Sequence, residues 1–232
     1  MSKLSIGTWQ SLPSESIAEI FSKAGYEWIV IDLEHSTITI NQAEKLIRVI
    51  DLAGSKPFVR LSGHDPAQIK RVLDAGAKGI LAPMIETQNQ IEKIISACHY
   101  PPRGTRGMGL ARAQGFGERA AKEEYILNNS NNIEIYAQIE STKGLKNCKD
   151  IFSQNINGYF IGTCYDGKTV FKLLEDKNTD EGITIMKNDR KIFEITKMYD
   201  KTGFPDEEMS LGYAINVFQE SINIIWACIL II

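Results

Sequence analysis

Polar and charged side chains follow several short apolar runs of the chain, and their types are those that catalysis and metal binding use. In chain order they are Asp32, Glu34, His35, Arg60, Glu86, Gln138, Glu140 and Asp166. Carboxylate oxygens suit a hard divalent cation such as Mg²⁺ or Mn²⁺ better than zinc. An imidazole can transfer protons near neutral pH, and a guanidinium can stabilise a developing oxyanion. If these side chains converge, they predict a site for metal-assisted chemistry.

Each of these residues also has a structural interpretation. Arg60 suits a buried ion pair, because its guanidinium binds carboxylates with two parallel hydrogen bonds. His35 suits a loop histidine with satisfied hydrogen bonds, and Glu140 suits a surface carboxylate at the end of a strand. Scattered structural charges need not converge, whereas residues at successive strand ends do. Their shared position therefore favours function for the group.

The segments around these side chains alternate between apolar runs typical of buried strands and amphipathic stretches typical of helices. The pattern predicts strands over residues 4–9, 28–33, 57–61, 79–85, 133–139 and 159–162. It predicts helices over residues 13–25, 41–52, 65–76, 90–99, 119–127 and 145–152, several of which begin near Pro and end near Gly. Successive βα units predict a parallel sheet with right-handed crossovers.

The expected fold class is α/β, a (β/α)₈ TIM barrel formed by residues 1–232 as one domain. An open, doubly wound sheet fits less well, because no dinucleotide-binding glycine motif follows the first strand. The active site of a barrel collects at the carboxyl ends of its strands. The polar side chains named above stand at those ends.

Beyond Asp166 the alternation fades, so we expect a barrel that is incomplete or irregular after strand six. Residues 191–199 look helical, and residues 211–218 and 222–232 look like strands seven and eight. Too few residues separate these two strands for a crossover, which needs about a dozen. Alternatively, residues 219–232 form one apolar helix and strand eight is missing. In either case the apolar segment must pack against the barrel or a neighbouring subunit, because a long exposed apolar run would aggregate. We therefore expect a homo-oligomer.

Composition excludes several classes of function. The chain has 232 residues, with 26 Lys and Arg against 29 Asp and Glu, and a formal charge of −3. No excess of positive charge is present to neutralise phosphates, so we expect no nucleic-acid partner. Four scattered cysteines and three histidines argue against structural zinc. The N-terminus has no signal-like apolar run, and the apolar C-terminus is too short for a membrane span. We therefore expect a cytoplasmic protein that does not bind a membrane.

Five segments carry a resemblance to a known family. They are GTW at residues 7–9, AGYEWIVIDLEH at 24–35, PFVRLSGHDPAQIKRVLDAGAKGILAPMI at 57–85, YPPRGTRGMGLARA at 100–113 and QIESTKGL at 138–145. In this order and spacing they resemble the HpcH/HpaI aldolases, which are metal-dependent class II pyruvate aldolases. The resemblance implies a TIM barrel, assembled as a hexamer or trimer. The reaction it implies is reversible cleavage of 4-hydroxy-2-oxo acids to pyruvate and an aldehyde.

The resemblance also implies a divalent cation, Mg²⁺, Mn²⁺ or Co²⁺. Its ligands would be Glu140 and the Asp of an I-G-P-x-D-L-S motif. Here the chain reads IGTCYDG at residues 161–167, with one more residue before the Asp and no Leu-Ser after it. Asp166 is therefore the candidate for the second metal ligand, and its displacement would give low activity. A barrel that has lost catalysis is an alternative.

The remaining site residues receive roles from the same resemblance. Arg60 would bind the carboxyl and enolate oxygens of pyruvate, and Gln138 would line the pyruvate site. His35 would assist proton transfer, with Asp32 and Asp74 as its polar supports. These roles agree with the chemistry, since breaking a C–C bond beside a ketone leaves an enolate. A divalent cation and a nearby guanidinium stabilise such an oxyanion, and a base takes the hydroxyl proton.

A competing motif occupies residues 162–169, where GTCYDGKT fits the P-loop pattern G-x-x-x-x-G-K-[ST]. It follows a predicted strand and precedes a stretch compatible with a helix. No apolar run ending in a second acidic residue follows it, and Gly162 already belongs to the aldolase-like motif. A nucleotide- or phosphate-binding protein that uses residues 162–169 is therefore the alternative to an aldolase.

Overall fold

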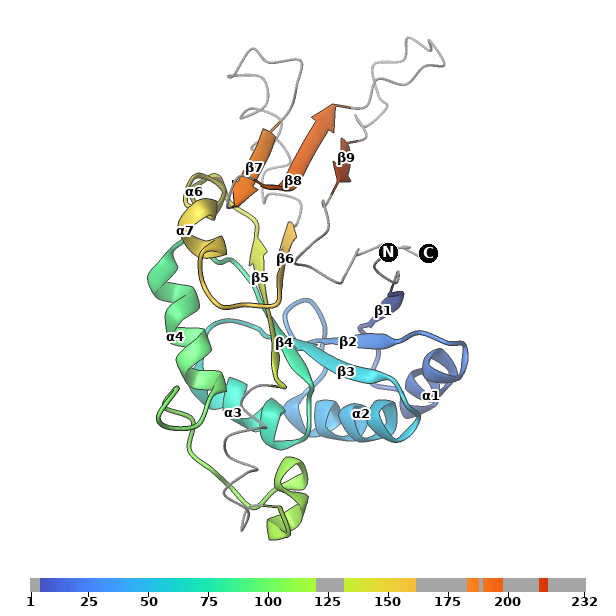
Figure 1. The fold of residues 1–232 in the computed structure, drawn as a ribbon. Coiled ribbons are helices and arrows are strands. Elements are labelled where there is room, and N and C mark those ends of the chain that lie inside the picture. The colour runs from blue at the N-terminus through green and yellow to red at the C-terminus, as the bar shows by residue number, and fades with distance from the viewer. Residues whose placement is uncertain (1–4, 120–131, 162–182, 188–189, 198–212, 217–232) are drawn as a thin grey trace, which may run out of the picture. The chain divides into compact units, whose positions relative to one another are not determined.

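A computed structural model describes residues 5–119, 132–161, 183–187, 190–197 and 213–216 of the chain (Figure 1). The described residues fall into two compact units, one with residues 5–119 and 132–161, the other with residues 183–187, 190–197 and 213–216. Within the described residues, no helix combines the length and apolar character that crossing a membrane requires.

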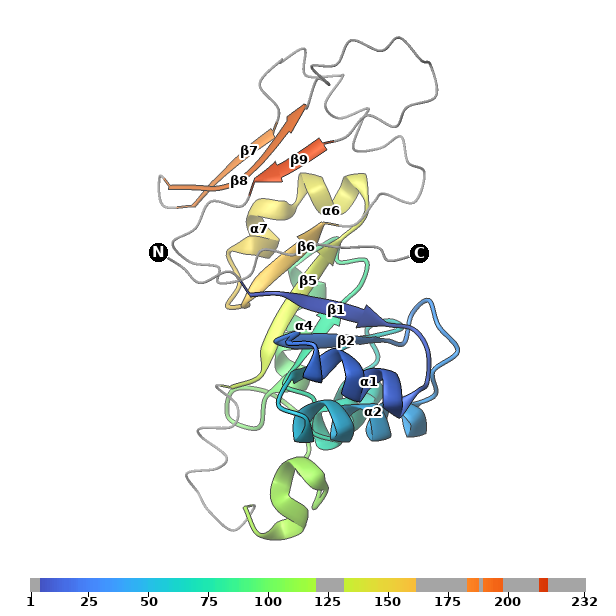
Figure 2. The ribbon, with the colours of Figure 1, turned by 90° about the vertical axis from the view of Figure 1, so that its right-hand side faces the viewer.

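The larger unit contains a six-stranded parallel sheet whose order follows the sequence. The strands are β1 (Gly7–Gln10), β2 (Trp28–Asp32), β3 (Lys56–Arg60), β4 (Gly79–Ala82), β5 (Glu134–Ile139) and β6 (Gly158–Ile161). Figures 1 and 2 show the sheet curling from β1 to β6. An order without reversal is typical of a barrel wall, whereas a doubly wound sheet reverses at its centre. The predicted α/β fold, irregular after strand six, is confirmed.

Helices connect these strands and return the chain to the amino edge of the sheet. They are α1 (Glu15–Lys23), α2 (Ile40–Leu52), α3 (Pro66–Asp74), α4 (Gln88–Cys98), α6 (Thr142–Lys146) and α7 (Cys148–Phe152), with a 3₁₀ turn η1 (Arg112–Gly117). The helix expected over residues 145–152 begins earlier and breaks at Asn147, so it forms two short helices. Nearly all of the helix expected over residues 119–127 lies outside the described residues.

The sequence supplies a cap at the start of each long helix. Ser14, Thr39, Asp65 and Thr87 accept hydrogen bonds from backbone N–H groups two or three residues further on. These bonds satisfy donors that the first turn of a helix leaves without partners. At its other end α2 is followed by Gly54, whose φ of +94° suits glycine and stops the helix. Local residue choice therefore sets where each βα unit turns.

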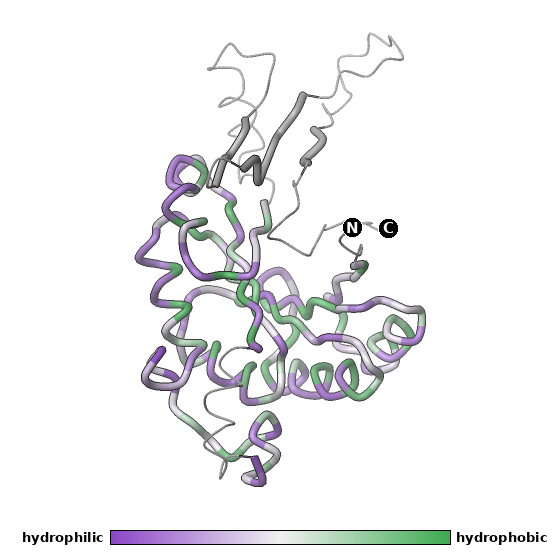
Figure 3. The backbone as a smooth tube through the Cα atoms, in the orientation of Figure 1, coloured by the Kyte–Doolittle hydropathy of each residue, from purple (hydrophilic) through white to green (hydrophobic). Residues whose placement is uncertain are grey.

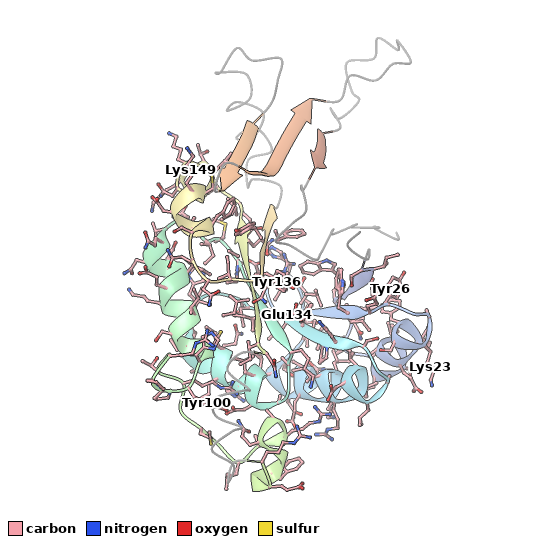
Figure 4. All side chains as sticks on the ribbon, in the orientation of Figure 1. Lys23, Tyr26, Tyr100, Glu134, Tyr136 and Lys149 are labelled. Atoms are coloured by element: carbon pink, nitrogen blue, oxygen red, sulfur yellow. The ribbon has the colours of Figure 1, made fainter. Side chains whose placement is uncertain are left out.

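The core lies between the sheet and its helices and inside the curl of the sheet. All five residues of β2 are buried, as in a strand covered on both faces. Figure 3 shows hydrophobic residues along the strands and on the inner sides of the helices. The fully buried rings of Phe58 and Tyr136 lie 5.7 Å apart between centroids. The Tyr136 hydroxyl donates a hydrogen bond to Glu134 at the start of β5 (Figure 4).

Several ion pairs lie at the amino edge of this sheet. Asp51 at the end of α2 lies 3.0 Å from Nζ of Lys78 and 2.5 Å from Nη2 of Arg112. Lys56 pairs with Glu134 at 2.6 Å. These contacts join helix ends to strand beginnings, far along each strand from its carboxyl end. Their role is structural.

The smaller unit contains a three-stranded antiparallel sheet formed by β7 (Ile183–Lys187), β8 (Arg190–Lys197) and β9 (Tyr213–Asn216). The helix predicted over residues 191–199 is wrong, because residues 190–197 form β8. This segment reads RKIFEITK, and its β-branched and aromatic residues favour a strand. β9 lies within the strand expected at residues 211–218, but it pairs with β8 and not with the parallel sheet. The strand or helix expected over residues 219–232 lies outside the described residues.

Candidate active site

The carboxyl ends of β2, β3 and β5 bring polar side chains to one edge of the parallel sheet. Asp32 is the last residue of β2 and stands in register with Arg60, the last residue of β3. The loop after β2 carries Glu34 and His35. Gln138 lies near the end of β5, and Glu140 follows that strand. The sequence-predicted convergence of these residues is therefore a consequence of strand register.

Arg60 is the central cation of this edge, and its side chain is only 12% exposed. Its Nε and Nη2 donate hydrogen bonds to the two oxygens of Asp32, at 2.9 and 2.6 Å. Its guanidinium carbon lies 4.6 Å from the centroid of the Trp9 ring on β1. A bidentate carboxylate on one side and an aromatic face on another fix the guanidinium plane. Both interpretations of Arg60 are thus compatible, because a well-built ion pair also orients its remaining N–H groups.

Asp32 is ionised more readily than an ordinary aspartate. Burial, the largest single influence, favours the protonated acid, but the hydrogen bonds and charge of Arg60 outweigh it. Two backbone N–H groups act in the same direction, and together they lower the pKa of Asp32. These N–H groups belong to Glu34 and His35 and lie 3.0 and 3.2 Å from Oδ1 of Asp32. Asp32 therefore supports the backbone of the loop that carries His35, and not the imidazole ring.

The side chain of His35 is 70% exposed, and its Nε2 lies 3.7 Å from Oε2 of Glu34. The same oxygen of Glu34 lies 3.3 Å from Nη1 of Arg60. Burial raises the pKa of Glu34, and the negative charges of Glu140 and Asp32 add to this effect against the positive charges of Arg60 and His35. Glu34 received no individual role from the sequence. Its part in the site depends on a loop conformation that residue spacing does not reveal.

Both carboxylate oxygens of Glu140 are held in place. Oε1 accepts a hydrogen bond from Nε2 of Gln138 at 2.7 Å, and Oε2 accepts one from the backbone N–H of Met84 at 2.9 Å. Met84 adopts a φ of +50°, which is uncommon for a residue other than glycine and typical of functional sites. The backbone of Gln138 also accepts from the N–H of Ile85 at 2.9 Å. The turn after β4 therefore orients Glu140.

Gln138 contributes an unusual acceptor to this arrangement. Its side chain is 2% exposed, and its Oε1 has no hydrogen-bond partner among the residues that the structure describes. A buried amide oxygen without a partner costs free energy. In native proteins such an atom is often satisfied by a water molecule, an ion or a ligand.

The expected support of His35 by Asp74 does not form within the chain. Asp74 ends α3 and binds Nη2 of Arg106 at 2.6 Å and Nε2 of Gln114 at 3.0 Å. Gln114 also donates to the hydroxyl of Tyr100, which Figure 4 labels. The physical reason is topological, because α3 returns the chain to the amino edge of the sheet. His35 follows a carboxyl end, at the opposite edge.

Glu86 belongs to a structural contact between two loops. Its carboxylate accepts hydrogen bonds from Oγ of Ser141 at 2.8 Å and from Nζ of Lys143 at 3.1 Å. Its backbone oxygen accepts from the amide of Asn147. These bonds tie the loop after β4 to the start of α6, beside the loop that carries Glu140.

The expected second metal ligand, Asp166, lies outside the described residues, as does the P-loop-like segment at 162–169. In the part of the chain that the structure describes, no group of three or more His, Cys, Asp or Glu side chains is arranged to hold a metal ion. Glu140 is the predicted metal ligand that this part contains.

The chain resembles known proteins over most of its length. The HpcH/HpaI aldolase/citrate lyase family matches residues 5–186. A hydroxypyruvate/pyruvate aldolase of Rhizorhabdus wittichii is 38% identical over 158 residues, which are 66% of this chain and 60% of that protein. A protein of the same description from Roseobacter denitrificans is 33% identical over 189 residues, 80% of this chain and 73% of that protein.

A solved structure shows the same likeness. A HpcH/HpaI aldolase/citrate lyase family protein of Burkholderia cenocepacia superposes with a TM-score of 0.65 and 31% identity, over 72% of this chain and 66% of that one. The matched part of the chain spans 60% of the length of the Rhizorhabdus aldolase. The residues that the family matches include Asp32, Arg60 and Glu140. The chain belongs to the HpcH/HpaI aldolase/citrate lyase family.

Proposed function

We propose that the protein is a class II pyruvate aldolase, a lyase that reversibly cleaves a 4-hydroxy-2-oxo acid to pyruvate and an aldehyde. The observation that carries the proposal is the guanidinium of Arg60, fixed by Asp32 and Trp9 at the carboxyl edge of the sheet. Membership of the family and the pyruvate aldolase activity named for two relatives support it.

Arg60 has the geometry that this reaction requires of an oxyanion donor. Two of its five N–H groups bind Asp32, and Nη1 also lies 3.3 Å from Oε2 of Glu34. One further N–H group on each of Nη1 and Nη2 is left for substrate oxygens. Cleavage beside the ketone leaves negative charge on the 2-oxo oxygen. A guanidinium that is fixed before the reaction stabilises this charge without reorganising. Gln138, buried next to Glu140, would line the same site.

The residues also fit a divalent cation. Glu140 presents a carboxylate already oriented by Met84 and Gln138, and Oε1 of Gln138 is a buried acceptor without a partner in the described residues. Hard cations such as Mg²⁺, Mn²⁺ or Co²⁺ take oxygen ligands of these kinds. Glu140 and Asp166 would hold the ion, which supplies Lewis-acid polarisation of the 2-oxo group when bound.

His35 would take the proton of the 4-hydroxyl group. Its imidazole lies on the loop after β2, is largely exposed and is therefore accessible to a substrate entering at this edge. Asp32 anchors the loop through two backbone hydrogen bonds. An imidazole suits this task at neutral pH. A homo-oligomeric state and a cytoplasmic location are further parts of the proposal.

The test is pyruvate release from a 4-hydroxy-2-oxo acid in the presence of Mg²⁺, Mn²⁺ or Co²⁺, with and without EDTA. We expect turnover that chelation abolishes, and a Glu140→Ala variant that turns over far more slowly. Glu92→Ala, on the exposed side of α4, is the matched control and should keep full activity. Turnover that neither EDTA nor Glu140→Ala reduces would disprove the proposal. Absence of turnover with every metal would favour a barrel that has lost catalysis.

A further inference from the structure

Glu34 lies between the two positively charged or protonatable groups of the candidate active site. Its Oε2 is 3.3 Å from Nη1 of Arg60 and 3.7 Å from Nε2 of His35. The side chain of Glu34 is 16% exposed, whereas that of His35 is 70% exposed. The buried Oε2 has no hydrogen-bond partner of good geometry in the described part of the chain. Glu34 is thus a mostly buried carboxylate beside a mostly exposed imidazole.

More negative than positive side chains surround Glu34 when His35 is neutral. Arg60 faces it from β3, but this guanidinium already binds Asp32 with two hydrogen bonds. Glu140, after β5, and Asp32, on the adjoining strand, add negative charge from two further directions. The protonated form of His35 is then the remaining cation that faces Glu34 among the described residues. A proton arriving on His35 would therefore be stabilised by Glu34.

We infer that Glu34 is a positioning residue, which holds the imidazole of His35 on the Arg60 side of the loop and supplies its counter-charge when it is protonated. This inference rests on the proposed function, because it assigns to Glu34 a part in the proton transfer from the 4-hydroxyl group. A carboxylate beside a catalytic imidazole orients the ring and stabilises the imidazolium. Glu34 touches neither substrate nor reacting atoms in this assignment.

The first experiment tests the pairing without turnover. The chain has three histidines, so NMR can follow the imidazole signals of each one against pH. The His35 signal is assigned by its loss in His35→Asn. We expect Glu34→Gln to shift the His35 midpoint to lower pH by about half a unit, since a lost counter-charge weakens the protonated form. His64, whose Nε2 lies 2.6 Å from the carbonyl of Pro83, serves as the internal reference.

The matched control is Glu44→Gln, which removes an exposed carboxylate that pairs with Arg48 on α2. It should leave the His35 midpoint unchanged. A His35 midpoint that is the same in folded Glu34→Gln and in the unmodified protein would overturn the inference. Should Glu34→Gln not fold, Glu34→Asp provides the same test, because its shorter side chain moves the charge away from the ring.

The second experiment separates positioning of the base from substrate binding. For Glu34→Gln we expect kcat of aldol cleavage to fall about tenfold, a part of the acceleration that general base catalysis provides. KM for the oxo acid should stay within about twofold, since Arg60 keeps its bonds to Asp32. Unchanged kcat would overturn the inference. An inactive unmodified protein would instead reject the proposed function, while the NMR titration still decides whether Glu34 and His35 interact.

Discussion

Replacing Arg60 by alanine tests whether the guanidinium is both a structural partner and the oxyanion donor. The substitution removes two hydrogen bonds to Asp32 and leaves that carboxylate, 7% exposed, without a cation. Breaking a buried pair in this way typically costs about 3–5 kcal/mol. Protonating a carboxyl group with an ordinary pKa near 3.9 at pH 7 costs about 4 kcal/mol, and this bounds the penalty from Asp32. We therefore expect the free energy of unfolding to fall by roughly 3–4 kcal/mol at pH 7.

The pH dependence of this loss identifies its origin. Arg60 lowers the pKa of Asp32 in the folded protein, so the stabilisation is fully present above the unfolded-state pKa. It is lost as pH falls through the folded-state pKa. The difference in unfolding free energy between Arg60→Ala and the unmodified protein should therefore shrink below about pH 4. Urea unfolding followed by circular dichroism at pH 7 and at lower pH measures it.

Turnover should fall separately from stability. Loss of one oxyanion donor typically raises the barrier by about 2.7–4 kcal/mol, which is a factor of about 10²–10³ in kcat. The assay is pyruvate release at a temperature where unfolding curves show the variant to be folded. Arg48→Ala, which breaks an exposed pair on α2, is the control and should cost less than about 1 kcal/mol with no change in kcat. An Arg60→Ala protein with unchanged stability at pH 7, or with unchanged turnover, would refute this account.

Three further predictions concern the helices and loops of the larger unit. Burial favours protonated Asp51, but its two basic partners outweigh it and lower the pKa of Asp51. Asp51→Asn should therefore cost about 1 kcal/mol of unfolding free energy at pH 7 in urea titrations, and this cost should shrink as the pH falls below about 4. At Gly144 a Cβ atom would lie 2.5 Å from the carbonyl of Ile85, whereas at Gly63 it would meet open space. Gly144→Ala should thus lower the thermal midpoint through about 1–3 kcal/mol of overpacking, and Gly63→Ala should not. Burial raises the pKa of Cys98 to about 12, so mass spectrometry should find it alkylated by iodoacetamide at pH 8 only after unfolding.

Most of the larger unit could be predicted from the sequence because local signals agree with the fold. The run WIVID marks β2 as a strand buried on both faces, and Asp32 directly follows its apolar residues. The apolar run that ends at Arg60 marks β3 in the same way. Parallel pairing then places Asp32 and Arg60 at one edge without any knowledge of side-chain contacts. Convergence of the site is therefore readable from the order of strands and helices.

The wrong helix prediction has a physical cause. Residues 190–197 have a helix-like spacing of apolar positions, but Ile and Phe at these positions pack equally well in a strand, and pairing with β7 and β9 decides the outcome. The expected role of Asp74 at His35 is a different case. Within the chain, Asp74 binds Arg106 and Gln114, and the end of α3 lies only five residues before the start of β4. This short connection places Asp74 at the amino edge of the sheet, whereas His35 follows a carboxyl end.

The balance of charge among the described side chains is compatible with the proposed divalent cation. Asp32, Glu34 and Glu140 together carry three negative charges when ionised, and Arg60 carries one positive charge, which leaves an excess of two negative charges. After burial itself, the charge of Glu140 is the first influence that raises the pKa of Glu34. A divalent ion held at Glu140 would offset this excess and favour the ionised form of Glu34.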